Sequence, residues 1–361
     1  MFDVYLPKIS YNMDIGNKIR ELRTQKGFTQ EDLALHTGFS KSYIQKFEEN
    51  KREIKSSQLV KLSFALGTSI SEIFSTTNFN DKDYIFKNIE FREKSNLYNV
   101  EEFKNKITAN LYVEYSAYEV LEQLFNEKIM FRNPIENNEI SSFQEVEEIV
   151  FKLRKKWKFG TTPIYDLIGF LEDLGIKIFE VDREEDFVGF SCWMKKTPVI
   201  VVNTRNKDIP RRRFTVLHEL SHLLLKFSPD ISEKSIERFC DQFAGAMLLP
   251  EEALKEYLVS DSISLKELKR IKVKFGISII AILVRMASIN FISWDKYHEW
   301  KELYHSWRNK DVDYFGNETV SRFDYLLARA LREEKISYSK ASELVQKPIS
   351  ELKSEYLFKM G

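Results

Sequence analysis

The sequence predicts a mainly α-helical protein with a small mixed β-sheet, which places it in the α+β class. Apolar residues recur every three or four positions through most of the 361 residues, which is the spacing of amphipathic helices. Between positions 176 and 203, three short apolar runs separated by turn residues predict strands. Because these runs stand close together, we expect one small sheet surrounded by helices.

Length and local pattern divide the chain into four predicted parts. A chain of 361 residues is long for one domain. We predict a bundle of five short helices at 1–75 and a linker with a helical segment at 76–156. A core that contains the sheet follows at 157–290, and a helical region occupies 291–361.

Composition excludes several classes of protein. Lys and Arg number 55, as do Asp and Glu, so no global field attracts nucleic acid or a membrane. No apolar run approaches the roughly 20 residues of a membrane-spanning helix, and the first residues lack the blocks of a signal peptide. Two cysteines, Cys192 and Cys240, form no disulfide framework. We expect a soluble, cytoplasmic protein without membrane contact.

Residues 15–75 show the spacing of five short helices. Thr29 begins the second helix with Asp32 three positions later, as in a capping box, and Gly38 ends that helix. Ser40 begins the third. Two helices joined by a short turn that contains glycine form a helix-turn-helix, and the alternative is a small bundle for protein interaction. Ten Lys and Arg against seven Asp and Glu make the segment mildly basic.

This segment resembles the XRE family. Its pattern T-Q-x-x-L-A-x-x-x-G-x-S-x-x-x-I-x-x-x-E is met by Thr29, Gln30, Leu33, Ala34, Gly38, Ser40, Ile44 and Glu48. The resemblance implies that the third helix enters the major groove of double-stranded DNA. Its outward residues, which we expect to contact bases or phosphates, are Lys41, Ser42, Gln45 and Lys46. Gln30 should hold a phosphate, and the modest charge predicts a homodimer on a two-fold operator.

The region from 76 to about 106 is polar and predicts a linker with one short strand. Residues 106–127 and 142–156 have helical apolar spacing and are separated by the turn-rich stretch 131–139. No chemistry is visible in these two helices. We expect them to pack on the core that follows.

The core begins with a helix over 164–174, which follows Pro163 and ends at Gly175. The predicted strands are 176–182, 188–194 and 199–203. An edge strand of this sheet could hold an extended substrate by backbone hydrogen bonds. The sequence does not reveal which strand lies at the edge.

Residues 213–225, RFTVLHELSHLLL, predict a helix that is apolar nearly all round and therefore buried. The helix contains His218, Glu219 and His222 in the pattern H-E-x-x-H. Residues four apart share a helix face, so the two imidazoles project side by side and can bind one zinc ion. Glu219 is then placed as the general base for a zinc-activated water. The alternative, two solvated histidines on a surface helix, conflicts with the apolar surroundings.

Residues 232–250 predict a second helix, which ends at Pro250. Glu237 and Asp241 are four apart and share a face. We interpret Glu237 as the third metal ligand and Asp241 as the acceptor of a ring N–H from a ligand histidine. Glu233 also lies four positions from Glu237, and an ordinary solvated carboxylate pair is the alternative.

These segments resemble the ImmA/IrrE family of metallopeptidases. The family has a strand ending in Asn, then R-R-F-T-x-x-H-E-x-x-H, then E-x-x-A-N-x-F-A-x-x-L-L-M-P, which correspond to 199–203, 211–222 and 237–250. The resemblance implies a zincin-like domain with zinc ligands His218, His222 and Glu237 and a catalytic Glu219. Two departures are Cys240 for alanine and Asp241 for asparagine. Cys240 is either a spare soft ligand or a small buried hydrophobe.

Residues 264–287 predict two helices broken at Gly276. His298 and His305 lie in an aromatic-rich segment, and we expect packed or exposed histidines there rather than a fourth ligand. Residues 336–352 mimic a second helix-turn-helix. Because that stretch lacks a basic outward face, we predict an interaction region.

Two functions compete. In the first, a DNA-binding transcription regulator is fused to a zinc endopeptidase that cleaves a repressor or antitoxin-like partner, the anti-repressor role that the ImmA/IrrE resemblance implies. In the second, a regulator or antitoxin without enzymatic activity uses its zinc-binding domain as a sensor. An intact Glu219 favours the first, because a sensor needs no general base beside its metal.

Overall fold

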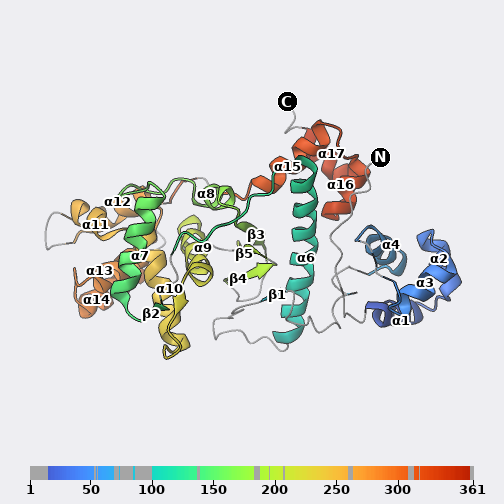
Figure 1. The fold of residues 1–361 in the computed structure, drawn as a ribbon. Coiled ribbons are helices and arrows are strands. Elements are labelled where there is room, and N and C mark those ends of the chain that lie inside the picture. Colours follow the sequence, from blue (N-terminus) through green and yellow to red (C-terminus); the bar gives the residue numbers. More distant parts are fainter. Residues whose placement is uncertain are drawn as a thin grey trace. The chain divides into compact units, whose positions relative to one another are not determined.

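The computed structural model describes residues 15–52, 54, 56–68, 73, 84–85, 100–135, 139–182, 188–194, 196–205, 208–258, 263–307, 313–316 and 318–357. Figure 1 shows the helices and strands along the chain. The chain forms two compact units, one of Met1–Tyr84, Asn96–Lys128 and Ser321–Gly361, the other of Ile85–Ser95 and Ile129–Val320. Among the described residues, no helix is long and apolar enough to cross a membrane. The four parts expected from the sequence stay a prediction.

The first bundle consists of α1 (Ile15–Gln25), α2 (Gln30–Thr37), α3 (Lys41–Glu48) and α4 (Ser56–Leu66). Its core includes Ile19, Leu33, Ile44, Phe47 and Leu62, each fully buried. The predicted caps are confirmed: Thr29 and Asp32 form a capping box, Gly38 adopts φ 70°, and the Ser40 side chain accepts from the Tyr43 amide. Of the predicted fifth helix, Ile73 is buried and its neighbours lie outside the described residues.

The same unit contains the long helix α6 (Val100–Phe125) together with α15 (Arg322–Arg332), α16 (Tyr338–Val345) and α17 (Ile349–Leu357). Helix α6 begins six residues earlier than the apolar spacing predicted, because no glycine or proline interrupts residues 100–105. It contacts α15 and α16. Arg329 of α15 lies 4.1 Å over the Phe125 ring and donates to Glu127 at 2.7 Å.

Strands β3, β4 and β5 of the second unit belong to the predicted mixed sheet, whose strand order is β1, β4, β5, β3. The bounds are β1 Tyr84–Ile85, β3 Lys177–Val181, β4 Gly189–Met194 and β5 Thr197–Asn203. Strand β5 runs parallel to β3 and antiparallel to β4, with Val202 opposite Gly189. A separate parallel pair, β2 (Glu139–Ile140) with β6 (Lys226–Phe227), was not predicted, since two residues are too few to show a strand pattern.

Helix α8 (Leu167–Asp173) begins three residues later than predicted. The Asp166 side chain caps it by accepting from the Gly169 amide at 3.1 Å, and Asp is a stronger start signal than the earlier Pro163. The helix ends as predicted at Gly175, which has φ 89°.

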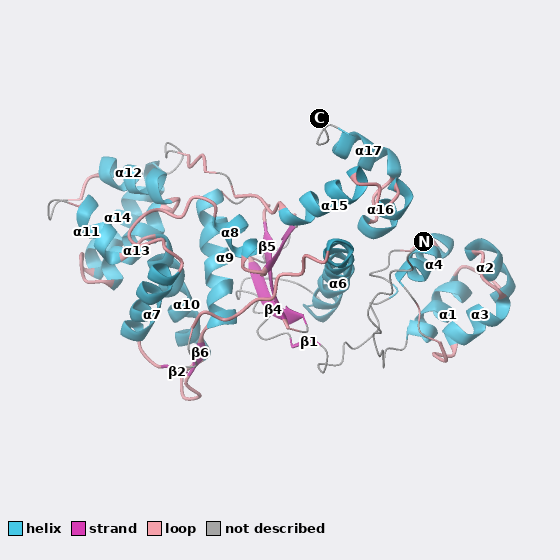
Figure 2. Cartoon of the chain, turned by 45° about the horizontal axis from the view of Figure 1, so that its top comes forward, coloured by secondary structure: helices cyan, strands magenta, loops and turns pink. Residues whose placement is uncertain are grey.

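The remaining helices of this unit are α7 (Phe143–Lys156), α9 (Ile209–Leu224), α10 (Glu233–Leu248), α11 (Glu251–Tyr257), α12 (Leu265–Phe275), α13 (Ile279–Ser288) and α14 (Trp294–Trp307). Figures 1 and 2 show α9 between the sheet and α10. The Asp208 side chain caps α9, so that helix begins four residues before the predicted stretch. Val202, Leu220 and Phe243 meet in one core formed by the sheet, α9 and α10.

Two ion pairs tie distant segments of this unit together. Arg213 of α9 pairs with Glu318, and both side chains are fully buried. Arg213 also donates to the Ile164 carbonyl at 2.6 Å, and Glu318 accepts from the Ile168 amide at 3.0 Å. In α13, Arg285 donates to Glu147 of α7 at 2.7 Å. The first pair fixes the start of α9, one and a half turns before His218.

Candidate metal centre

Helices α9 and α10 lie against each other and place four polar side chains on their shared face. His218 and His222 come from α9, one turn apart, and Glu237 and Asp241 come from α10, also one turn apart. The apolar residues on the other sides of α9, such as Leu217 and Leu220, are fully buried. Two turns of amphipathic spacing therefore place the imidazoles opposite the carboxylates.

The structure brings three predicted ligands to one point. His218 Nε2 lies 3.1 Å from Glu237 Oε2, and His222 Nε2 lies 3.2 Å from Glu237 Oε1. The two Nε2 atoms are 3.3 Å apart. Two ligands of a tetrahedral zinc, at bonds of about 2.0 to 2.1 Å, lie about 3.3 to 3.4 Å from each other. The spacing of the two Nε2 atoms agrees with this edge length, and the two spacings to Glu237, which involve different carboxylate oxygens, are about 0.1 to 0.3 Å shorter.

The hydrogen bonding at this point is also incomplete without a cation. Glu237 Oε1 is covered by protein and has no hydrogen-bond partner of adequate geometry. Two imidazole Nε2 atoms facing each other can share at most one proton without repulsion. Buried polar atoms usually have partners, so the orphaned oxygen and the facing nitrogens suit a bound metal ion. The donor set of two imidazoles and one carboxylate suits zinc.

The opposite nitrogens of both rings face α10. His218 Nδ1 lies 2.9 Å from Asp241 Oδ1, and His222 Nδ1 lies 3.6 Å from Cys240 Sγ. Burial lowers the pKa of His218, but its hydrogen bonds to Asp241 and Glu237 outweigh this and raise the pKa to about 9. Burial raises the pKa of Glu237, yet the two histidines hold it well below its usual range. The site thus favours an ionised carboxylate beside the imidazoles.

Glu219 lies beside the histidines on α9 and is buried. Burial raises the pKa of its carboxyl group, whereas the nearby His218 and His222 and a hydrogen bond donated by the Ser191 hydroxyl lower it; burial dominates. Ser191 belongs to β4 and is itself buried. A carboxyl group in this setting can hold a proton nearer neutral pH than an exposed glutamate can.

Gly189 of β4 explains how α9 comes so close to the sheet. A Cβ atom there would lie 2.9 Å from Thr215 Cγ2 and 2.8 Å from the Val201 carbonyl oxygen. Only glycine permits this approach, which lets Ser191 reach Glu219. Neither Gly189 nor Ser191 was predicted from the sequence. A glycine at the start of a strand was the available signal.

The predicted DNA-contacting residues lie on the first bundle. Lys41, Ser42, Gln45 and Lys46 are exposed on α3. Lys41 pairs with Glu31 at 2.6 Å, and Gln45 donates to Glu49 at 2.9 Å. These contacts are at the surface and can exchange for contacts with DNA.

Gln30 has a buried partner that the sequence did not reveal. Its Nε2 donates to Glu48 Oε2 at 2.8 Å, and Glu48 also accepts from Arg23 Nε at 2.6 Å. The Glu48 side chain is fully buried. Arg23 compensates its charge, and the Gln30 amide adds a hydrogen bond. The contact fixes Gln30 at the first turn of α2, against the end of α3.

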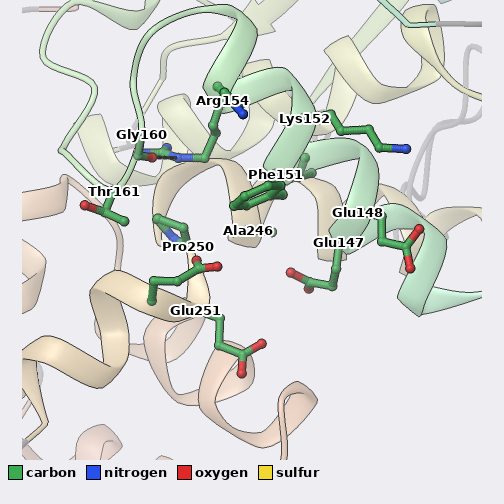
Figure 3. A pocket seen from close by; sticks show the side chains of 13 residues that line it. Glu147, Glu148, Phe151, Lys152, Arg154, Gly160, Thr161, Ala246, Pro250 and Glu251 are labelled. Atoms are coloured by element: carbon green, nitrogen blue, oxygen red, sulfur yellow. Dashed lines mark hydrogen bonds between the residues drawn. The ribbon is translucent and has the colours of Figure 1, made fainter.

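Two other places in the second unit carry polar side chains. His298 and His305 are exposed on α14, outside the group that contains His218 and His222. A cavity of about 540 Å³ lies between α7, the 160–161 loop and the junction of α10 with α11. Figure 3 shows the Phe151 ring in this cavity, with Glu147 and Glu251 below it and Arg154 above. Each nitrogen of the Arg154 guanidinium donates a hydrogen bond to a carbonyl group, those of Met247, Gly160 and Thr162.

Comparison with known proteins agrees with both parts of the fold. Residues 19–73 match a family described as helix-turn-helix, and residues 171–287 match a family described as the IrrE N-terminal-like domain. Fold and site thus define a class: a helix-turn-helix regulator joined to a domain of the metallopeptidase type. The chain belongs to the XRE-type helix-turn-helix regulators and carries an IrrE-like domain as its second part.

The relatives found cover the first part of the chain. The uncharacterized HTH-type transcriptional regulator y4dJ of Sinorhizobium fredii (strain NBRC 101917 / NGR234) is 34% identical over 64 residues, 18% of this chain and 83% of that protein. Control protein C.MunI of a Mycoplasma species is 36% identical over 61 residues, 17% and 82% of the two chains. The solved controller protein C.AhdI from Aeromonas hydrophila is 38% identical and covers 17% of this chain and 92% of its own, with a TM-score of 0.17.

Proposed function

We propose that this chain is a transcription regulator whose IrrE-like domain hydrolyses a peptide bond in a protein partner with the help of zinc. The observation that carries the proposal is the convergence of His218, His222 and Glu237 beside the buried Glu219. Because two imidazoles and one carboxylate occupy only three positions around a tetrahedral ion, a fourth position would stay open, as catalytic sites require. The partner we propose is a repressor or an antitoxin-like protein.

Three residues of this chain would bind the zinc ion, and a fourth would orient one of these ligands. His218 Nε2, His222 Nε2 and a Glu237 oxygen would hold the ion, and Asp241 keeps the proton of His218 on Nδ1 so that Nε2 stays free to bind. A bound zinc ion supplies a Lewis acid that makes water acidic enough to lose its proton near neutral pH. The polypeptide supplies the orientation of the ligands and the exclusion of bulk water.

Glu219 is the residue that we propose to move protons. Its carboxylate would take the proton of the attacking water and then donate a proton to the nitrogen of the leaving amine. Ser191 would fix one carboxylate oxygen by its hydroxyl group and so limit the rotation of Glu219. A sensor without enzymatic activity would need neither the buried carboxyl group nor its orientation.

The first bundle would bring this activity to DNA. We propose that Lys41, Ser42, Gln45 and Lys46 contact an operator in the major groove, with Gln30 beside a phosphate. The names of the related regulators and of the control protein support DNA binding. The weak charge of the module favours a homodimer on a two-fold operator. The protein would then act in the cytoplasm, where it meets both operator and partner.

The proposed peptidase activity is tested by Glu219→Gln, which keeps the volume, the helix and all three ligands. Glu233→Gln is the matched control, because it removes the same charge from an exposed position on α10. New protein N-termini would be compared by mass spectrometry in cells that produce each variant, with zinc content measured in parallel. We expect new N-termini with wild type and Glu233→Gln, and a loss of about 10² to 10⁴ in rate with Glu219→Gln.

The same experiment separates the enzyme from the sensor. If Glu219→Gln retains its zinc, produces the same N-termini as wild type and regulates its genes normally, the peptidase proposal is wrong. The IrrE-like domain would then act on gene control through metal binding alone.

A further inference from the structure

Two consecutive residues of α10, Cys240 and Asp241, contact the Nδ1 atoms of the two histidine rings. Asp241 Oδ1 lies 2.9 Å from His218 Nδ1, and Cys240 Sγ lies 3.6 Å from His222 Nδ1. Neighbouring residues on a helix point about 100° apart, so one turn of α10 can reach two rings that stand four residues apart on α9. The rings therefore have different partners: a carboxylate for one and a thiol for the other.

The Ser221 hydroxyl oxygen is available to the thiol as a hydrogen-bond acceptor. The Ser221 hydroxyl donates to the His218 carbonyl oxygen at 2.6 Å, so its own oxygen is left as an acceptor. Cys240 is 0% exposed, and its thiol lies close to the Ser221 hydroxyl. The S–H of Cys240 can therefore point to Ser221, which turns the sulfur lone pairs toward His222.

The sulfur can accept the Nδ1 proton of His222 in a hydrogen bond. When an imidazole gives its Nε2 lone pair to a metal, its proton must be on Nδ1. A buried N–H without an acceptor is costly, and Cys240 closes this side of the ring to water. A sulfur at 3.6 Å is a weak acceptor, but it is the group that this geometry offers.

We propose that Cys240 is the positioning residue of His222, as Asp241 is of His218, and that the thiol is not itself a metal ligand. The inference rests on the proposed metal centre. Cys240 Sγ meets Nδ1, whereas Nε2 is the atom that faces Glu237 and His218. The sulfur thus contacts the Nδ1 edge of the imidazole, and the ring separates it from the proposed ion site at Nε2.

The test compares three variants of the full chain. Cys240→Ala removes the sulfur, Cys240→Ser restores an acceptor, and Cys192→Ala is the matched control, because it deletes a thiol that is 1% exposed in β4. Zinc affinity would be measured by competition with a chelator. We expect Cys240→Ala to lose about tenfold in affinity, the lower end of the range for such partners, since sulfur accepts weakly. Cys240→Ser should recover most of this loss, and Cys192→Ala should match wild type.

A cobalt-substituted protein adds a readout that a purely structural role would not change. We expect the visible absorption bands of the bound cobalt to shift in Cys240→Ala and to return toward wild type in Cys240→Ser. A sulfur-to-cobalt charge-transfer band in wild type that disappears in Cys240→Ala would show a coordinating thiol and overturn the inference. So would a zinc affinity of Cys240→Ala within about twofold of wild type.

Failure of the metal centre itself gives a different result. A wild-type chain that binds neither zinc nor cobalt overturns the centre and the inference together, whereas unchanged affinity in Cys240→Ala overturns the inference alone. If Cys240→Ala does not fold, Cys240→Ser keeps the test decisive, because a tenfold loss in this variant would show that a hydroxyl does not replace the sulfur and that the acceptor role is wrong.

Discussion

Replacement of Glu318 by leucine should strongly destabilise the second compact unit. The carboxylate pairs with Arg213 where both side chains are 0% exposed, and it also accepts from the Ile168 amide at 3.0 Å. Glu318→Leu keeps most of the volume but leaves the guanidinium buried without its counter-charge. Burial already lowers the pKa of Arg213, which shows how poorly water solvates this cation.

The magnitude follows from the burial. Removing one partner of a fully buried ion pair costs about 3 to 5 kcal/mol in the free energy of unfolding. The unit has about 200 residues, and for that size 1 kcal/mol shifts the melting temperature by about 2 to 4 °C. Glu318→Leu should therefore lower the melting temperature by about 6 to 20 °C, measured by circular dichroism. Zinc binding should weaken as well, since Arg213 fixes the start of α9.

Two further variants test the reasoning. Arg213→Met with Glu318→Leu removes both charges and should recover most of the lost stability, because no uncompensated charge remains. Glu299→Leu breaks an exposed pair with Lys296 and should leave the melting temperature near that of wild type. A shift below about 2 °C in Glu318→Leu, or a double variant no more stable than the single ones, would refute the argument.

Two other outcomes follow from the same geometry. Asp241→Ala should weaken zinc binding by about 10-fold to 100-fold in a chelator competition, because the Nδ1 proton of His218 loses its acceptor; unchanged affinity would remove Asp241 from the centre. Lys46→Ala should weaken operator binding by about 1 to 3 kcal/mol if Lys46 makes a bidentate contact with guanine. If Lys46 contacts a phosphate instead, the slope of log affinity against log salt concentration should fall by about 1. A gel-shift titration at several salt concentrations separates these cases, and a curve like that of wild type in all of them would exclude the residue.

Features that depend on neighbours in sequence were predicted well. The capping box of Thr29 with Asp32, the left-handed Gly38 and the cap at Ser40 all appear as expected. So do the broken helix at Gly276 and the start of α7 at Ser142. Such features depend on hydrogen bonds within one helical turn, and these residues form them whatever the rest of the chain does.

Three helix starts were predicted less well, even where an aspartate caps the helix. Helix α8 begins at Leu167, after its cap Asp166, rather than directly after Pro163, and α6 extends to Val100. Helix α9 begins before its apolar stretch because Asp208 caps it and Pro210 fits the first turn. Apolar spacing marks the part of a helix that packs, whereas a helix can continue past that part into solvent.

The sequence by itself determined the helical pattern, the strands of the sheet and the two imidazoles on one face, because these follow from spacings of two to four residues. Only the tertiary structure decided the partners across longer distances: Ser191 for Glu219, Cys240 for His222, and Glu318 for Arg213. Any of 55 acidic residues could have paired with that arginine. The choice among them depends on which segments pack together, and packing is a property of the whole core rather than of any local stretch.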